Sequence, residues 1–308
     1  MIANAFVHDT SSYILMRFIV GIGVAGELGL GATLVAETIH SSKRTYALTF
    51  FTVMGTLGVA AAASSIEFMH WRTSCIAGGI LGILLLLLRS VLFESQLYAQ
   101  IAQTRARRGY LRDLFGVFHN LKKYVYCVLV LAPNYFVTGM IITLSPEVGR
   151  ATGVEGVIKP NIALAAYFTV AAFGDLIGAW LSERFRSRRV VAGAYVFGNM
   201  ILAIIIMQNW RLDAVQFYAL CAAFGLFNLW AISGTIVVEQ FPTVLRATAS
   251  TASLNFSRGT IIISNFLFLQ FRSYGMTNSL LVIGMGFFIL GLLAVWRLPE
   301  TYGHSLAD

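Results

Sequence analysis

Long apolar runs alternate with short polar connections along almost the whole chain. The pattern predicts an all-α polytopic membrane helix bundle with about nine transmembrane helices, because a helix that crosses the hydrocarbon core of a bilayer needs about 20 mostly apolar residues. The runs fall at roughly residues 13–37, 46–66, 74–93, 124–145, 161–181, 190–208, 214–238, 249–271 and 278–296.

The composition supports a membrane protein. The chain is 57% hydrophobic and 12% charged, whereas soluble domains carry about 25% charged residues. The cysteines lie inside apolar runs, which favours packing over a disulfide framework. The histidines are scattered near the ends of runs, so no metal-ligand cluster and no cofactor are predicted. We expect no enzyme, because no histidine lies well inside a run where a catalytic set could form.

Lysine and arginine alternate between the connections. Most of the 22 basic residues lie in every second connection, above all in 105–123 and 184–189. The positive-inside rule assigns these connections to the cytoplasm. The net charge of +8 is thus explained by topology and by contact with anionic lipid head groups of the bilayer. Nucleic-acid binding is not predicted, because no basic patch lies on a soluble fold.

Two distant segments share the same spacing of charges. The stretch LVAETIHSSKRT holds Glu37 and Arg44, and the stretch VVEQFPTVLRAT holds Glu239 and Arg246. The offset between them indicates an internal repeat of about 200 residues. The first three runs then match the last three, and the middle three have no partner. The repeat therefore predicts three further helices ahead of Met1.

Parallel repeats of six spans are the architecture of the major facilitator superfamily, and the chain resembles that family over essentially its whole length. The stretch RFIVGIGVAGE (17–27) looks like the family's fourth-helix motif. The longer pattern GIGVAGELGLGA…AE…KR and the ending LPETYG are similar to the metabolite:proton symporter branch and the sugar porters. The stretch GAWLSERFRSRR (178–189) resembles the family's basic loop motif, with the usual glycine replaced near Arg186 and Ser187.

The resemblance implies a partial major facilitator fold in three parts. Residues 1–93 would be the remainder of the N-terminal bundle, equivalent to helices 4–6. Residues 94–123 would be a cytoplasmic linker, and residues 124–308 a C-terminal six-helix bundle.

The implied function is secondary active transport of a small polar or anionic metabolite across the inner (plasma) membrane by a monomer. The second run, GTLGVAAAA, lacks the proline of the family's antiport motif, which favours proton symport. A truncated, non-transporting remnant is the alternative.

Two carboxyl groups inside apolar runs, Glu27 and Asp175, are candidate proton carriers. A charge at the centre of a membrane helix costs at least ~2.5–3.5 kcal/mol, so such groups usually face a cavity. Desolvation also favours the neutral form of a carboxyl group. A structural hydrogen bond to a neighbouring helix is the alternative for each.

Run 249–271 carries Thr251, Asn255, Arg258 and Asn265 on one face, which we expect to point into the bundle. Arg258 could hold an anionic substrate group by two parallel hydrogen bonds, or it could pair with Glu27 or Asp175. Thr49, Thr52 and Thr56 also share a face, and either line a pathway or bond their own backbone. Together with the family's fourth-helix arginine, the predicted substrate and proton pathway comprises Arg17, Glu27, Asn134, Tyr135, Asp175, Asn228, Asn255 and Arg258.

Charged residues at the ends of the runs are candidates for a cytoplasmic gate. Hydrated ion pairs contribute only about 0.2–1 kcal/mol each, so a network of them can close firmly and open readily. Ordinary flanking charge at helix ends is the alternative. The predicted gate residues are Glu37, Arg44, Glu183, Arg184, Glu239 and Arg246.

Overall fold

The structure is a computed structural model that describes residues 1–39, 43–89, 114–208 and 211–303. The side chains of 26–30, 33, 36–37, 44–45, 89 and 243–244 also lie outside the described part. Most of the predicted linker therefore falls on residues that are not described.

The described residues form helices joined by short turns and loops, with no strand, which confirms the predicted fold class. Nine helical rods within the described ranges match the nine predicted runs, with ends that differ by at most six residues, and α10 and α11 together make one of them. Their bounds are α1 Thr10–Thr38, α2 Arg44–Ser65, α3 Trp71–Arg89, α6 Phe118–Phe136 continued by the π-helix η3 Val137–Ile142, α8 Pro160–Arg184, α9 Arg188–Ile206, α10 Ala214–Leu226 with α11 Trp230–Gln240, α12 Thr243–Phe271, and α13 Met276–Arg297. The short helix η1 Ile2–Phe6 precedes α1, and the short helices α7 Ser145–Ala151 and η4 Arg272–Tyr274 lie between longer ones.

Seven stretches of the described residues are long and apolar enough to cross a bilayer. They lie in α2, α3, α6 with η3, α8, α9, α10 with α11, and α13, while α1 supplies only the shorter apolar segment Thr10–Ala25. Helix α12 has the length of a span but not its hydropathy, because serine, threonine and asparagine recur along it.

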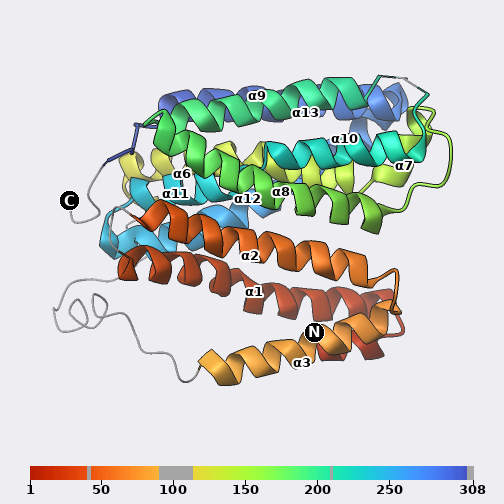
Figure 1. Cartoon of the computed structure of the whole chain (residues 1–308), viewed down its shortest axis with the longest axis horizontal. Coiled ribbons are helices and arrows are strands. Elements are labelled where there is room, and N and C mark those ends of the chain that lie inside the picture. Colours follow the sequence, from red (N-terminus) through yellow and green to blue (C-terminus); the bar gives the residue numbers. More distant parts are fainter. Residues whose placement is uncertain (40–42, 90–113, 209–210, 304–308) are drawn as a thin grey trace.

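The helices from α6 to α13 pack around one core, and α1 to α3 lie on one side of it (Figure 1). The buried residues of the main core extend from Leu114 to Leu298 and include none from α1, α2 or α3. Leu114 is fully buried although it belongs to the predicted linker. In the view of Figure 1, α9 and α13 form the top layer, and α2, α1 and α3 follow one another at the bottom.

Helix α2 lies along α8 and joins the two groups of helices. Five of its buried residues are spaced by three and four positions, which places them on one helix face. They are Thr49, Val53, Thr56, Ala60 and Ala63, and the neighbouring Leu48 is buried against Val238 of α11. The α2–α8 seam therefore runs from one end of the bundle to the other.

Helices α8 and α10 touch through their backbones. A Cβ atom on Gly174 would lie 2.2 Å from the carbonyl oxygen of Gly225, and one on Gly225 would lie 2.4 Å from that of Tyr167. Small residues allow such close approach of helices in a membrane. These glycines fix the distance between the two helices.

The buried face of α12 differs from the predicted stripe. Asn265 is exposed and donates to the Ile261 carbonyl of its own helix. The face that packs inward carries small hydroxyl residues instead, and the Ser257 hydroxyl lies 3.3 Å from the Val128 carbonyl of α6. The buried hydroxyl residues of this face are Ser250, Ser253, Ser257, Thr260 and Ser264. The hydroxyls of Ser257, Thr260 and Ser264 donate to carbonyls of α12 itself, which lets this face pack closely.

The C-terminal ends of α8, α11 and α13 and the N-terminal end of α9 meet at one end of the bundle. The backbone nitrogen of Arg188 donates to Glu300 at 2.8 Å, and the Gln240 amide donates to the Pro299 carbonyl at 2.9 Å. This is the end that the positive-inside rule assigns to the cytoplasm, and it is called the cytoplasmic end below.

Cysteine labelling tests this topology. Single cysteines at the exposed positions Arg186 and Pro242 should resist a membrane-impermeant maleimide added outside and react after permeabilisation. Cysteines at Tyr274 and Asn278, at the opposite end, should react without permeabilisation. The background replaces the three free cysteines, Cys75, Cys127 and Cys221, with alanine. Labelling of positions 186 and 242 from opposite sides would contradict the fold.

Candidate functional site

The run predicted as one helix at 214–238 is broken in its middle. Helix α10 ends at Leu226 and α11 begins at Trp230, so Asn228 lies in the break. A broken membrane helix leaves backbone groups that neighbours must satisfy. The Asn199 amide of α9 donates to the Phe227 carbonyl at 2.9 Å. Helix α8 satisfies the other side of the break through Asp175.

Asp175 is fully buried beside this break. Its Oδ1 accepts the backbone N–H of Ala231 at 3.1 Å, and its Oδ2 accepts the side-chain amide of Asn228 at 3.0 Å. Ala231 is in the first turn of α11, where unpaired N–H groups and the helix dipole favour a negative charge. The carboxylate of one helix therefore caps the N-terminus of another.

Thr56 brings the α2–α8 seam to the same carboxyl group. Its hydroxyl oxygen lies 3.4 Å from Asp175 Oδ2 and 2.9 Å from the Thr52 carbonyl oxygen. A hydroxyl has one proton to donate, and the shorter contact assigns that proton to the carbonyl. A lone pair of Thr56 is then left to accept a hydrogen bond from Asp175 whenever the acid is protonated.

Tyr167 extends the network to α6. Its hydroxyl lies 3.2 Å from Asn228 Oδ1 and 3.3 Å from Asn134 Oδ1. One proton thus serves two acceptors. We call Thr56, Asp175, Asn228, Tyr167 and Asn134 the polar cluster.

The structure thus brings together the predicted residues Asn134, Asp175 and Asn228. Tyr167 was not among the predicted residues, because a lone tyrosine in an apolar run carries no distinguishing signal in the sequence.

A second group adjoins the polar cluster. The guanidinium carbon of the half-buried Arg258 lies 5.9 Å from the ring centre of Trp230, the first residue of α11. The Tyr135 hydroxyl is buried, faces Arg258 and Trp230, and has no hydrogen bond of ordinary geometry within the described part. Arg258 makes no ion pair with any described residue. We call Tyr135, Trp230 and Arg258 the arginine group.

The remaining residues of the predicted pathway have different outcomes in the structure. Asn255 donates at 2.8 Å to the Ala25 carbonyl of α1, so it joins the two groups of helices. Arg17 is exposed, and its Nε donates to the Tyr13 hydroxyl of its own helix at 2.8 Å, away from the polar cluster. The side chains of Glu27, Glu37 and Arg44 lie outside the described part, and their roles stay predictions.

At the cytoplasmic end the partner of the predicted acids is Arg188. Its Nη1 lies 2.9 Å from Glu183, and its Nε lies 3.6 Å from Glu239. The Ser182 hydroxyl accepts from the same guanidinium at 2.7 Å. Arg184, which was predicted in this role, is exposed and makes no ion pair within the described ranges. Sequence reasoning counted Arg188 only as loop charge, since nothing in the pattern set it apart from its neighbours.

Arg246 is fully buried and bonds backbone rather than facing solvent. Its Nε donates to the Val238 carbonyl at 3.1 Å. Val238 is in the last turn of α11, where carbonyl groups lack partners within the helix and favour a cation. Arg246 therefore holds the end of α11.

The family's missing glycine has a structural counterpart. Arg186 has a φ of 52°, a left-handed conformation that glycine adopts without strain. The turn between α8 and α9 is therefore the turn of the basic loop motif, here made with an arginine.

A profile of the Major Facilitator Superfamily matches residues 1–264. This chain belongs to the Major Facilitator Superfamily. Proteins of similar sequence are also transporters or solute carriers. The chain is 27% identical to human solute carrier family 22 member 13 over 100% of this chain and 60% of that protein. It is 24% identical to the gallate transporter of Pseudomonas putida, over 95% of this chain and 71% of that protein. The 4-hydroxybenzoate transporter PcaK of Acinetobacter baylyi is 23% identical over 80% and 62% of the respective chains.

A solved structure shares the fold. The outward conformation of the superfamily transporter FucP matches with a TM-score of 0.64 at 14% identity, over 97% of this chain and 79% of that one. A second structure of FucP, described as the fucose:proton symporter of E. coli, matches with a TM-score of 0.58. The chain spans about two thirds of the length of the curated relatives named above, between 60% and 71%.

Membership of the superfamily confirms several predictions. The chain has a partial major facilitator fold, is a multi-pass protein of the plasma membrane, and belongs to a family of transporters rather than enzymes.

An ion pair at the outer end of this superfamily member was not predicted. Glu67, just beyond α2, lies 2.9 Å from the Lys159 ammonium and accepts from the Asn161 amide at 2.7 Å. Both partners belong to the start of α8, so the pair closes the outer end of the α2–α8 seam. The hydrogen bonds from Asn161 and Lys159 hold the pKa of Glu67 below its ordinary value of 4.5.

Neutralising this acid should loosen the outer end of the seam. A depressed pKa means that the ion pair is complete at neutral pH and is lost as the pH falls through the lowered value. In Glu67→Gln, a cysteine at the buried position Ala63 should react several-fold faster with an external thiol reagent at pH 7. The Glu155→Gln variant, which alters an exposed acid at the same end, is the matched control. Equal rates in the two variants would contradict this role.

Proposed function

We propose that this superfamily member is a proton-coupled symporter of a small organic anion that works by alternating access. The observation that carries the proposal is the buried Asp175 carboxyl group, which lies at the α2–α8 seam and caps the broken helix. Superfamily transporters bind substrate near the midplane between two bundles that move against each other. A group at the seam is therefore placed to change its surroundings during transport.

We assign residues 1–93 to the remainder of the N-terminal bundle and residues 124–308 to the C-terminal bundle, with 94–123 between them. The main core supports this division, because none of its buried residues comes from 1–93 and all of them except Leu114 come from the part of the chain after the linker region.

Asp175 is the proton carrier in this proposal, because both of its protonation states have partners. As a carboxylate it accepts from Asn228 and the Ala231 N–H. As an acid it can donate to the lone pair of Thr56 across the seam. Separation of α2 from α8 would remove the partner of the protonated form only. Opening of the seam would then favour release of the proton.

The arginine group is the proposed substrate site. Arginine forms paired, charge-assisted hydrogen bonds with carboxylates, and Arg258 has no acidic partner among the described residues. Trp230 offers an aromatic face and Tyr135 an unpaired buried hydroxyl. The relatives named for gallate and 4-hydroxybenzoate act on aromatic carboxylates. An aromatic or similar cyclic carboxylate is therefore the substrate class that we propose.

The start of α11 connects the two sites. Trp230 lies beside Arg258, and the next residue, Ala231, donates its N–H to Asp175. A substrate that displaces Trp230 would move the hydrogen-bond donor of the proton carrier. This gives a direct structural route for coupling.

The cytoplasmic gate in this proposal comprises the predicted acids together with Arg188. Glu183 and Glu239 come from the ends of α8 and α11, and one guanidinium holds both. Glu37, Arg44, Arg184 and Arg246 remain members of the proposed gate, with Arg246 supporting the end of α11.

Replacement of Asp175 by asparagine should separate transport from the proton gradient. The isosteric amide keeps an acceptor for the Ala231 N–H but has no proton that it can release or take up near neutral pH. Cells that express the variant should lose accumulation of labelled 4-hydroxybenzoate against its gradient, by at least about tenfold. They should retain exchange of external label for unlabelled internal substrate.

The control for Asp175→Asn is Asn265→Ala, an exposed change in α12 that should leave both activities intact. Loss of exchange together with accumulation would contradict the role of proton carrier. If the wild-type chain shows neither activity for any carboxylate, the chain is a non-transporting remnant and the proposal fails.

Replacement of Arg258 by glutamine should weaken substrate binding. A hydrogen bond to a charged group contributes about 1.5–3 kcal/mol, so the concentration for half-maximal exchange should rise about 10–100-fold. Arg258→Lys should recover only part of the loss, because lysine cannot form the paired geometry. Neutral analogues such as the substrate's amide should bind equally to all three proteins, and unequal binding would contradict the carboxylate contact.

A further inference from the structure

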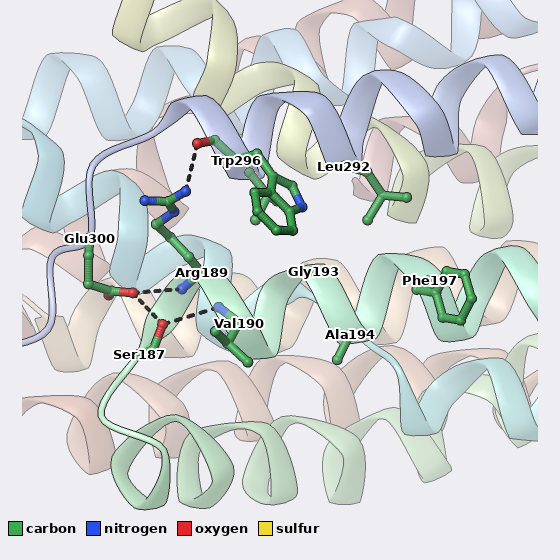
Figure 2. A pocket seen from close by; sticks show the side chains of 10 residues that line it. Ser187, Arg189, Val190, Gly193, Ala194, Phe197, Leu292, Trp296 and Glu300 are labelled. Atoms are coloured by element: carbon green, nitrogen blue, oxygen red, sulfur yellow. Dashed lines mark hydrogen bonds between the residues drawn. The ribbon is translucent and has the colours of Figure 1, made fainter.

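A groove lies between α9 and α13 near the cytoplasmic end, away from the polar cluster and the arginine group. Its volume is about 570 Å³. Figure 2 shows the small residues Gly193 and Ala194 on α9 and Leu292 on the neighbouring α13, with Trp296 nearer the end of the bundle, and all four line the groove. The remaining lining residues are Ser187, Arg189, Val190, Phe197, Val295 and Glu300.

The groove opens to the outside of the bundle. Val190, Phe197 and Trp296 all have most or half of their surface exposed, and α9 and α13 form an outer layer in Figure 1. From Arg189 to Phe197 the groove descends ~12 Å along the helix axis. Half the thickness of the hydrocarbon core is ~15 Å. The apolar part of the groove therefore spans much of one leaflet.

The mouth of the groove carries the basic side chain of Arg189, and the neighbouring acid, Glu300, already has hydrogen-bond donors of its own. The Glu300 carboxylate accepts the N–H groups of Arg188, Arg189, Thr301 and Tyr302 and the hydroxyl of Ser187. Burial by itself raises the pKa of Glu300, but the hydrogen bonds from Ser187 and the backbone outweigh it and hold the pKa below its ordinary value. The Glu300 carboxylate is thus bound to the start of α9 and does not pair with the Arg189 guanidinium.

Arg189 keeps most of its hydrogen-bonding capacity. One N–H of the Arg189 Nη2 donates to the Trp296 carbonyl at 2.7 Å (Figure 2). This bond holds the guanidinium over the mouth of the groove. A guanidinium has five N–H donors, and the others make no side-chain hydrogen bond or ion pair with the described residues. An exposed tryptophan at this level is typical of the membrane–water interface.

We propose that the α9–α13 groove is a binding site for an anionic phospholipid of the cytoplasmic leaflet. The phosphate lies on the free edge of the Arg189 guanidinium, and one acyl chain runs past Gly193 and Ala194 toward Phe197. Charge and depth both select this occupant, because the cytoplasmic leaflet is rich in anionic lipids and each basic residue near it adds attraction. A second copy of the chain is less suited, since a flat helix face would not fill a groove of this depth.

Brominated lipids provide the test, because bromine on an acyl chain quenches a neighbouring tryptophan. The purified protein is reconstituted in phosphatidylcholine bilayers that contain a minor fraction of brominated phosphatidylglycerol, or of brominated phosphatidylcholine. The signal of Trp296 is the difference between the wild type and Trp296→Phe. Phosphatidylglycerol should quench this signal at several-fold lower mole fraction than phosphatidylcholine.

Two variants separate the head-group contact from the acyl contact. Arg189→Gln should weaken the preference for phosphatidylglycerol about fivefold, as expected for the loss of one basic residue at the surface. Gly193→Leu should reduce quenching by both lipids, because the side chain fills the groove. Position 193 has room for the start of a side chain, since the nearest atom to an added Cβ is Val295 Cγ1 at 3.8 Å. Lys122→Gln, an exposed basic residue at the same end, is the control and should behave as the wild type.

Equal quenching by the two lipids in the wild type would overturn the proposal, as would an unchanged preference in Arg189→Gln. Quenching that falls as the protein associates into dimers would identify a second copy as the occupant, and would overturn it too. Native mass spectrometry of the detergent-purified protein gives an independent readout. Retained phosphatidylglycerol should be lost in Arg189→Gln and kept in Lys122→Gln.

Discussion

A carboxylate inside a membrane bundle must be satisfied by its neighbours, and the arrangement around Asp175 follows from that requirement. Removing a charge from water costs several kcal/mol unless donors replace the water. The break between α10 and α11 provides those donors through Asn228 and the Ala231 N–H. The break in turn needs the carboxylate, because it leaves the start of α11 without partners. The acid and the broken helix therefore stabilise each other, and neither is expected without the other.

The same requirement determines where the bundle can divide. The bonds from Asn228 and Ala231 lie within the C-terminal group of helices, whereas Thr56 reaches Asp175 from α2 across the seam at 3.4 Å. The seam is otherwise lined by small and apolar residues of α2, and one ion pair closes its outer end. Such an interface has few directional bonds to break. In the alternating-access cycle that we propose, the two groups of helices would separate along it while each keeps the hydrogen bonds made within its own group.

Much of the fold could be predicted from the sequence, because each apolar run had to form a membrane helix. The predicted runs match the helices to within a few residues, and the paired charges pointed to the end where α8, α11 and α13 meet. The break at Asn228 could not be predicted, since the run 214–238 is apolar enough on average to read as one span and hydropathy does not report a break in the backbone. The sequence pattern also did not show which polar residues of α12 are buried. The predicted stripe was based on the spacing of large polar residues such as Asn265, which points outward, whereas the buried face holds small hydroxyl residues that pack more closely.

The candidate site was predictable only in part. Asp175, Asn134 and Asn228 stood out because polar groups are rare in apolar runs, and the structure brings them together. Arg188 did not stand out, because it is one of several arginines in a single connection. Only the turn at Arg186 brings its guanidinium group next to the carboxylates of Glu183 and Glu239. Glu67 and Lys159 are far apart in the sequence and unremarkable in composition. Pairs of this kind depend on tertiary geometry alone.

The crossing of α8 over α10 has a consequence for how freely this chain can vary. Gly174 and Gly225 approach each other's helices so closely that even a methyl group would collide with a carbonyl oxygen. The large aliphatic side chains on the outer surface, by contrast, meet lipid and can be exchanged for one another with little effect. Between this crossing and the outer surface, tolerance to substitution is therefore the reverse of what side-chain size suggests: Gly174 and Gly225 are hard to replace, whereas the large exposed aliphatic residues are easily exchanged.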